Sequence, residues 1–568
     1  VFDSLPTEFL FSISDSDLMT LIEHVLEAEQ EEDLRIDITT QKRKDAAFIL
    51  LALPRQHWSD DRIPEIVDLL KSKTQATYVD HGAFVSRYNT MLVHFFLTGA
   101  SEFDQGILDQ IRSSLSDLIK PWKVKLRDSL LERFGDEKGE HLFHRYGSAF
   151  NPTYIKLRPM KEVLSDIEKL EELRNTDHPL VDIFVVEGRE RIYVRVYQSQ
   201  NLLLSEMLPV IDDFGLQVLD QFADPIFCAD GLRQTIDTFR LELLEGVSIE
   251  KIMERAELLA RGLEAVFAQK MGTDGLNYLV LHAGVSWSAV DLFRAIHGYS
   301  RQLGLPYPLP RVQGLLLSNV SALQVVWSFF EAKFDPDIED RETAIAVARE
   351  NVDALIRSIS NQAQDLVFRT FYNIIDSILR TNFYRQDRLF HYISFKIDCA
   401  KVHNMPSPRM MVEVYVHHRE MEGIHLRGGK IARGGIRWSD RTDFRREILD
   451  LVATQMVKNV IIVPEGAKGG FRMKKQIVDW SARRRKADQL YQVLIRGLLD
   501  VTDNQVDGQI VHPPRVVRHD EADPYLVVAA DKGTAHLSDT ANGLSAEYNF
   551  WLGDAFASGG SNGYDHKA

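Results

Sequence analysis

The stretch "VPEGAKGGF", residues 463–471, places one lysine, Lys468, among three glycines at the end of the apolar run "NVIIV". Glycines of this kind let the backbone turn tightly or approach a ligand closely. The lysine is therefore a phosphate clamp, a catalytic amine or a solvated loop residue. A phosphate-binding P-loop carries a serine or threonine directly after its lysine. Because Gly469 and Gly470 follow Lys468, the phosphate clamp is excluded.

A second lysine ends an apolar helical stripe upstream. Its residues are spaced by four, three, four and three positions, so they share one face of a helix. They are Phe444, Ile448, Leu451, Gln455 and Lys458. Lys458 lies at the inner end of this stripe and in the last helical turn, where the helix dipole favours a cation. Either its stem reaches out to solvent, or it is a fixed positive charge that awaits an anion.

A two-glycine turn and an aspartate complete the set of candidate residues. The segment "ARGGIRW" holds, in order, Arg433, Gly434, Gly435 and Arg437. In "PYLVVAADKGTA" the apolar run ends at Asp531. Lys468 and Asp531 each follow a predicted apolar strand directly, and ligand sites of open α/β sheets form at the carboxyl ends of strands. We therefore expect Lys468 and Asp531 to lie at one edge of a crevice.

The elements that position these residues predict a multidomain protein of α/β and α+β class. At 568 residues the chain is too long for a single hydrophobic core. Strands predicted at 191–198 and 216–222 enclose a helix, a pattern that resembles the ACT-type regulatory module. A helical segment follows, and strands return at 391–398, 410–418 and 423–429.

These patterns divide the chain into four predicted regions. They are an N-terminal α/β and helical region (1–176), an ACT-like α/β module (177–245), a helical region (246–388) and the α/β domain that holds the candidate residues (389–568). Within the helical region, residues 341–382 contain neither proline nor glycine. This stretch predicts either one long helix that bridges domains or packs in an oligomer, or two helices with a disguised break.

The bulk composition argues against several classes of protein. The formal net charge of -16 argues against a general nucleic-acid binder. Two cysteines, Cys228 and Cys399, exclude a disulfide framework and fit a reducing cytoplasm. The apolar run from Gly314 carries several polar residues, so it predicts a buried core helix rather than a membrane span. No G-x-G-x-x-G dinucleotide fingerprint follows a predicted strand. Metal ligation is poorly supported, since the adjacent His417 and His418 point to opposite faces of a strand.

Several of these segments resemble the glutamate dehydrogenases, and most closely the large NAD-dependent bacterial class. The segments are "RGGKIARGGIRWSDR", "KNVIIVPEGAKGGF", "IRGLLDVTDN" and the run from "YLVVAADKGTA" to "GYDHK". The resemblance covers residues 389–568 almost throughout, and the ACT-like and helical parts upstream fit the large class more loosely. It implies an α/β substrate-binding domain at 389–568 and an enzyme that oxidises L-glutamate to 2-oxoglutarate and ammonia.

The resemblance also implies a role for each candidate residue. In the wider family two cations hold the two substrate carboxylates, a further lysine is catalytic, and an aspartate after a later strand moves protons. Carried over, the substrate-binding set is Arg433, Gly434, Gly435 and Lys458, and the catalytic set is Lys468 and Asp531. Arg433 stands where the small enzymes have a lysine, which keeps the charge but turns it into a planar fork.

The implied cofactor is NAD, bound by a domain that in the family follows "GYDHK". The chain ends at Ala568, so we expect part of a longer enzyme that has no turnover alone. The implied partners are glutamate and 2-oxoglutarate, an amino-acid effector and further copies of the same chain, in the cytoplasm. Neither nucleic acid nor a membrane is an expected partner. Two alternatives stay open: a non-catalytic amino-acid-sensing or assembly module, and a dehydrogenase for another amino acid.

Overall fold

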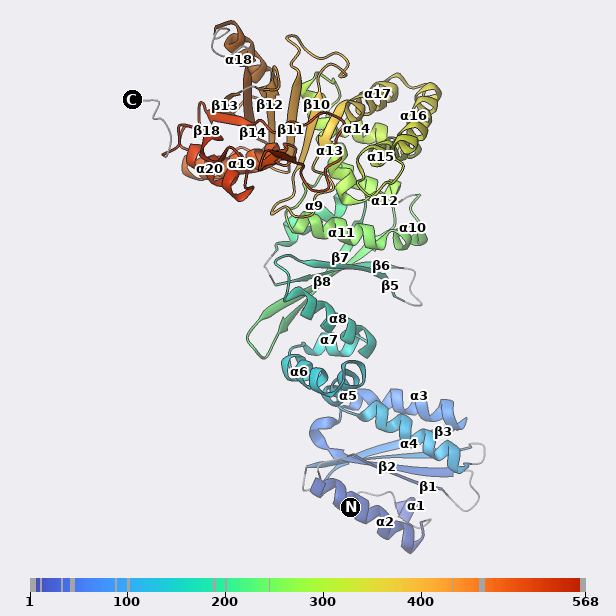
Figure 1. Cartoon of the computed structure of the whole chain (residues 1–568). Helices are drawn as coiled ribbons and strands as arrows, with labels where there is room; N and C mark the ends of the chain where they lie inside the picture. The colour runs from blue at the N-terminus through green and yellow to red at the C-terminus, as the bar shows by residue number, and fades with distance from the viewer. Residues whose placement is uncertain are drawn as a thin grey trace. The chain divides into compact units, whose positions relative to one another are not determined.

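The computed structural model divides the chain into two compact units. One comprises residues 1–168 and 225–233, and the other comprises residues 169–224 and 234–568. The structure describes residues 7–10, 13–31, 34–40, 46–86, 89–99, 103–186, 191–199, 202–244, 246–431, 433–458 and 465–561. Helices and strands alternate in both units (Figure 1), which confirms the predicted mixed α/β and α+β class. The predicted four-region division stays a prediction.

The first unit contains a four-stranded antiparallel sheet with helices on both faces (Figure 1). Its strands, in the sheet order β1-β2-β4-β3, are β1 (Arg35–Thr40), β2 (Ala46–Pro54), β4 (Thr90–Thr98) and β3 (Tyr78–Val85). Its helices include α1 (Thr7–Leu10), α2 (Asp15–Glu31), α3 (Ile63–Thr74), α4 (Gln105–Ile119), α5 (Trp122–Phe134), α6 (Asp136–Tyr146) and α7 (Pro152–Leu157), and α8 (Met160–Leu173) begins there.

The central strand β2 shows why this unit needs helices on both sides. Its apolar run is buried almost throughout because alternate residues face opposite layers. Ile49 and Leu51 pack with α3 and α4, whereas Phe48 and Leu50 pack with α2. Residues 104–135, whose apolar residues recur at helical spacing, form two helices, α4 and α5. They separate just before Pro121, because proline removes a helical hydrogen-bond donor.

The second unit begins with another four-stranded sheet, in the order β5-β6-β8-β7, although residues 225–233 of β7, β8 and their connection belong to the first unit. Its elements are β5 (Leu180–Val185), β6 (Ile192–Gln198), α9 (Leu204–Asp213), β7 (Gln217–Phe227), β8 (Arg233–Glu242) and α11 (Ala256–Phe267). The strand–helix–strand pattern predicted over 191–222 is confirmed. One face of the sheet packs against α9 and α11. Gly262 of α11 lets this helix lie close to Phe214, at the end of α9. A Cβ atom there would overlap the ring of Phe214.

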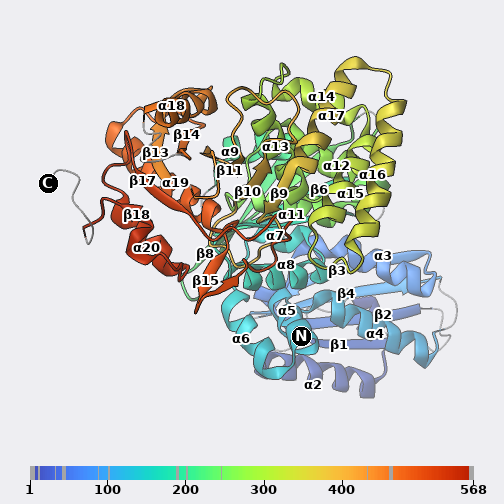
Figure 2. The ribbon, with the colours of Figure 1, turned by 45° about the horizontal axis from the view of Figure 1, so that its top comes forward.

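Helices dominate the middle of the second unit, shown in green to yellow in Figure 2. They are α10 (Ile249–Glu254), α12 (Tyr278–Ala283), α13 (Trp287–Gln302), α14 (Leu309–Leu317), α15 (Val320–Phe334), α16 (Arg341–Ser358) and α17 (Gln362–Ser377). A single helix over 341–382 is therefore wrong, and the alternative of two helices is confirmed. The break needs no glycine, because the Asn361 side chain caps α17 by accepting from the amides of Ala363 and Gln364.

The apolar run from Gly314 likewise spans two helices rather than one. α14 and α15 meet at an angle of 100°. Among the helices that the structure describes, none is by itself long and apolar enough to cross a membrane. Only this bent pair, taken together, has such a length and composition. Phe329 and Phe330 of α15 are fully buried in the protein core, as predicted for a core helix.

An eight-stranded mixed sheet forms the C-terminal part of the second unit. Its order is β18-β17-β13-β14-β12-β11-β10-β9. The strands are β9 (Ile378–Thr381), β10 (Ile393–Asp398), β11 (Val412–His418), β12 (Met421–Arg427), β13 (Arg433–Ser439), β14 (Ala467–Met473), β17 (Val527–Ala530) and β18 (Ala557–Ser558). The strands predicted at 391–398, 410–418 and 423–429 are confirmed as β10, β11 and β12. β9 to β12 run antiparallel, whereas β13 is parallel to both of its neighbours.

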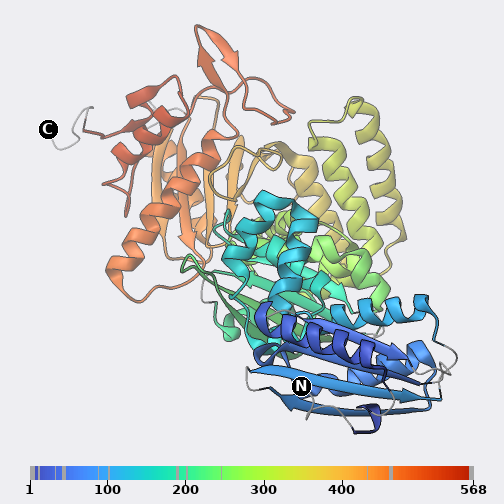
Figure 3. The same cartoon turned by 90° about the horizontal axis from the view of Figure 1, so that it is seen from below.

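Helices cover both faces of this sheet. α19 (Trp480–Leu499) lies across one face (Figure 3), together with α20 (Ser538–Glu547). On the other face, α18 (Phe444–Lys458), α13 and α17 pack against the strands. A projecting hairpin of β15 (Asn504–Val506) and β16 (Gln509–Val511) follows α19 (Figure 3). The buried Arg445 of α18 pairs with Glu413 of β11, which fixes the start of α18 on the sheet.

Six charged side chains fasten the loop after the hairpin to the edge of the sheet. The cations are Arg380 of β9, Lys396 of β10 and Arg427 of β12. The acids are Asp503, which directly precedes the hairpin, and Asp520 and Asp523 of the loop. Lys396 Nζ lies 2.5 Å from Asp520 and 2.7 Å from Asp523. Burial alone would raise the pKa of the Asp523 carboxyl, but Arg427 and Lys396 lower it to about 2.

We predict that Asp523→Asn destabilises the protein by at least about 2 kcal/mol at pH 7, because the folded protein lowers the pKa of this carboxyl from 3.8 to about 2. A carboxyl whose folded pKa is depressed stabilises above its unfolded pKa of 3.8 and loses this contribution as pH falls toward 2. Urea unfolding should therefore show a smaller difference at pH 3 than at pH 7. Glu521→Gln is the control, because Glu521 pairs only with the exposed Lys430. Equal midpoints for Asp523→Asn and the parent at pH 7 would contradict the prediction.

Candidate functional site

The register of β13 brings Lys468 and Asp531 together. Ile436 of β13 lies opposite Gly469 on one side and opposite Ala530 on the other. The start of β14 is therefore level with the end of β17. In this arrangement Lys468 Nζ lies 3.0 Å from Asp531 Oδ2, and both side chains are largely buried, 22% and 15% exposed.

The predicted cause of this proximity was wrong for Lys468. Asp531 does follow its strand, β17, directly. Lys468 is instead the second residue of β14, so it lies near the amino end of its strand. The strand predicted at "NVIIV", residues 459–463, falls outside the described residues. Stagger between neighbouring parallel strands, rather than two aligned carboxyl ends, creates the pair.

Arg437 extends this pair into a chain of alternating charges. Its guanidinium donates to Asp531 Oδ1 at 3.2 Å and to Glu447 Oε1 at 3.0 Å. Ser439 Oγ donates to the second oxygen of Glu447 at 2.6 Å. The chain therefore runs from Lys468 through Asp531 and Arg437 to Glu447, which α18 presents to the sheet.

The charges of this chain keep both carboxyls ionised. Burial alone would raise the pKa of Asp531, but the Lys532 amide, Lys468 and Arg437 hold it below its usual value. In the same way, burial is outweighed at Glu447, where Ser439 and Arg437 lower the pKa. Asp531 is consequently ionised at neutral pH.

The glycines of the site serve close packing of the backbone. A Cβ atom on Gly434 would overlap the carbonyl oxygen of Ala467, and one on Gly435 would lie 2.9 Å from the carbonyl oxygen of Ala530. The space beside Gly469 is filled by Ile436 and that beside Gly470 by Ile448, so protein rather than a ligand occupies it.

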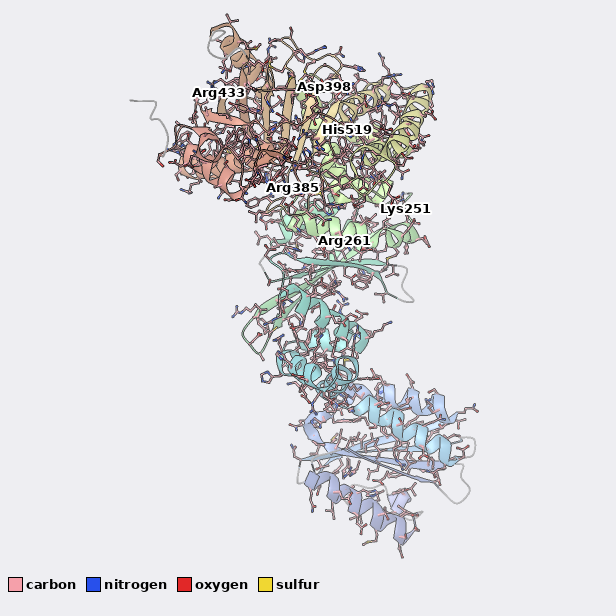
Figure 4. The ribbon with its side chains drawn as sticks, in the orientation of Figure 1. Lys251, Arg261, Arg385, Asp398, Arg433 and His519 are labelled. Atoms are coloured by element: carbon pink, nitrogen blue, oxygen red, sulfur yellow. The ribbon has the colours of Figure 1, made fainter. Side chains whose placement is uncertain are left out.

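The predicted two-glycine turn is wrong, because this segment forms strand β13; Arg433 lies at the start of that strand, and Lys458 lies at the end of α18. Arg433 begins β13, two residues before Gly435, and is exposed; Figure 4 shows it by the eight-stranded sheet. Within the described residues its guanidinium has no hydrogen-bond or ion-pair partner, while its carbonyl accepts from Gln455 Nε2 at 3.3 Å. Lys458 is the last residue of α18, and its side chain lies outside what the structure describes. The predicted helical stripe is confirmed at its start, since Phe444 and Ile448 are fully buried.

Sequence reasoning missed Glu447 as part of the site. A signal for it was present, because Glu447 lies three residues after Phe444 and four before Leu451, on the same helical face. An acidic residue within an apolar stripe needs a cationic partner, which Arg437 provides. Among the described residues, no group of three or more His, Cys, Asp or Glu side chains could hold a metal ion.

We predict that Gly434→Ala destabilises the protein by about 1–3 kcal/mol, because the added methyl group collides with the backbone of β14. The matched control is Gly543→Ala within α20, where a Cβ atom meets nothing within 4 Å. Removing a helical glycine there should stabilise by about 0.5–1 kcal/mol. Differential scanning calorimetry of the intact protein measures both changes, and an equal Tm for the two variants would contradict the prediction.

Four family models match the chain. The model described as "Bacterial NAD-glutamate dehydrogenase, catalytic domain" matches residues 351–568. Upstream, "Glutamate dehydrogenase, helical motif 3" matches 271–336 and "Glutamate dehydrogenase, ACT3 domain" matches 185–252. "Glutamate dehydrogenase, helical motif 2" matches 129–173. The predicted ACT-like module is therefore confirmed, and the candidate residues all lie within the catalytic-domain match.

Curated relatives are similar over the entire chain. The NAD-specific glutamate dehydrogenases of Pseudomonas aeruginosa and Halomonas elongata are each 33% identical over 100% of the chain. That of Mycobacterium tuberculosis is 32% identical, again over 100% of the chain. The chain spans 36–37% of the length of these relatives. With identity along its whole length and four matching models, the chain belongs to the bacterial NAD-specific glutamate dehydrogenase family.

Proposed function

We propose that the intact protein oxidises L-glutamate to 2-oxoglutarate and ammonia with NAD, and that this chain carries the substrate side of the active site. The observation that supports this most strongly is the 3.0 Å pair of Lys468 and Asp531. Arg437 also donates to Asp531 and is itself bound by Glu447. A partly buried lysine beside an ionised carboxylate supplies both a cation and a proton acceptor at one place.

Bound NAD would supply the hydride acceptor for the α-carbon, and in this proposal the residues of this chain manage protons and water. Asp531 accepts a proton from the substrate ammonium group and passes it to solvent before the carbon–nitrogen double bond forms. Lys468 then orients and polarises the water that adds to this carbon, and Asp531 takes the proton that the water loses. The same carboxyl returns a proton to the nitrogen, so that ammonia leaves and 2-oxoglutarate remains.

Arg437 and Glu447 position Asp531 in this proposal. The guanidinium reaches one Asp531 oxygen, whereas Lys468 holds the other. Glu447 anchors the same guanidinium to α18. Both carboxylate oxygens therefore have fixed donors, which orients the carboxyl toward a substrate before it binds.

Specificity for a dicarboxylate would come from Arg433 and Lys458. Glutamate carries two carboxylates, and these two cations would each bind one, with Gly434 keeping β13 close to β14 and Gly435 keeping it close to β17. Arg433 is exposed and has no ion-pair partner among the described residues, which is the state expected of a cation that binds substrate. A dehydrogenase for leucine or phenylalanine would favour an apolar residue there.

NAD would bind to a part of the protein outside these residues. The chain contains no dinucleotide fingerprint after a strand, and its relatives are nearly three times as long. We also propose a cytoplasmic homo-oligomer and an amino-acid effector bound by the ACT-like module, which the ACT3 match supports. Light scattering and effector titration of the intact protein test these two proposals.

We predict that Lys468→Ala in the intact enzyme lowers kcat by about 10²–10⁴-fold, the usual contribution of a catalytic acid–base group. Glutamate binding should be largely retained, because the carboxylates are held elsewhere. Lys532→Ala is the matched control, since Lys532 is next to Asp531 and its side chain is exposed. Steady-state kinetics with glutamate measure both variants. A kcat for Lys468→Ala within a few fold of the parent would rule out the proposed role.

We predict that Arg433→Ala raises KM for glutamate by about 10-fold or more, the effect of losing one charge-assisted hydrogen-bond pair. KM for norvaline, which has one carboxylate, should change much less. Arg441→Ala is the control, because Arg441 is exposed and already pairs with Asp443. If KM rose equally for both substrates, Arg433 would not be the source of dicarboxylate specificity.

A further inference from the structure

A cavity of about 390 Å³ lies in the second unit and shares no residue with the Lys468 cluster. Its wall is built by the loop after β9, the end of α19, the β15–β16 hairpin and the end of α20. Figure 4 labels Arg385 on this wall. The volume falls in the range of sites that hold small molecules.

Three arginines and two carboxylates line the cavity, so the lining carries an excess of positive charge. Arg385 is fully paired, with Asp387 at 2.7 Å and with the buried Asp500 at 2.9 Å. The oxygens of Asp500 are themselves occupied, since Asn382 and Tyr548 also donate to them. Neither acid is therefore free to neutralise another arginine.

Arg388 has no carboxylate partner among the described residues. Its guanidinium donates instead to three backbone carbonyl oxygens, those of Arg385, Tyr392 and Phe383. Burial lowers the pKa of Arg388, although the group stays charged. Burial removes hydration from this cation, and the carboxylates that attract it, Asp500 and Asp387, already bind Arg385, so Arg388 lacks a counter-charge in direct contact. An anion in the cavity would supply that counter-charge.

Two further donors line the same space. Arg496 pairs with Glu547 through one terminal nitrogen at 2.5 Å, but its Nε is buried and has no partner within the described residues. His512 is held through Nδ1 by the buried Asp503 at 2.7 Å, which fixes the ring. Tyr392, Tyr548 and Phe550 add aromatic walls.

We propose that this cavity is a binding site for a small organic anion, whose carboxylate or phosphate is held by Arg388 and Arg496, with His512 as a third donor. The body of the ligand packs against the aromatic walls. Its size lies between a dicarboxylate and a mononucleotide, as the volume allows. This site is separate from the substrate site and does not depend on the role proposed for Lys468.

Isothermal titration calorimetry of the intact protein tests the proposal with three probes: inorganic phosphate, succinate and AMP. At least one probe should bind with a Kd below 1 mM. Arg388→Gln and Arg496→Gln should each weaken that binding tenfold or more, because each removes a charge-assisted hydrogen bond. Succinate against AMP distinguishes a carboxylate ligand from a nucleotide. Phosphate alone shows whether the anionic group suffices.

Two controls make the result specific. Arg484→Gln removes an exposed arginine from the same helix and should leave the Kd unchanged. Lys468→Ala should also leave it unchanged, which separates this cavity from the substrate site. Thermal unfolding verifies that each variant is folded. If Arg388→Gln does not fold, the Kd of Arg496→Gln decides the test. The proposal is overturned if no probe binds below 1 mM, or if the cavity variants bind within twofold of the parent.

Discussion

The arrangement of the site depends on one strand, β13, which pairs in parallel with β14 on one side and with β17 on the other. These two strands come from segments about 60 residues apart in sequence. Only the register around Ile436 places the start of β14 level with the end of β17. A shift by a single residue would turn every side chain of β13 to the opposite face and separate Lys468 from Asp531.

Close packing enforces that register. Gly434 and Gly435 admit the carbonyl groups of the neighbouring strands at distances that no side chain would allow. On the sheet face that α18 covers, Glu447 of this helix forms an ion pair with Arg437. Arg445 of the same helix pairs with the buried Glu413. Helix and strand therefore hold each other through both backbone fit and buried charge.

The sequence was sufficient for the local features and insufficient for the long-range ones. Local patterns predicted β10 to β12 and singled out Lys468 and Asp531, and the resemblance implied their roles. The true cause of their proximity is strand pairing, which no local pattern encodes. The helix break before Asn361 was ambiguous because a side-chain cap, and neither proline nor glycine, ends the run. The ion cluster around Asp523 joins segments more than 90 residues apart, so spacing alone could not reveal it.

The pairing of Lys468 with Asp531 has a consequence for how a substrate is oriented. Before any ligand arrives, this lysine already has a counter-ion at 3.0 Å, so an approaching carboxylate would compete with Asp531 for it. The guanidinium of Arg433 has no such competitor among the described residues. In the proposed function, a substrate carboxylate would therefore meet less competition at the start of β13 than at the lysine. If the proposed function holds, the resting charges of the site would orient the substrate before any chemistry begins.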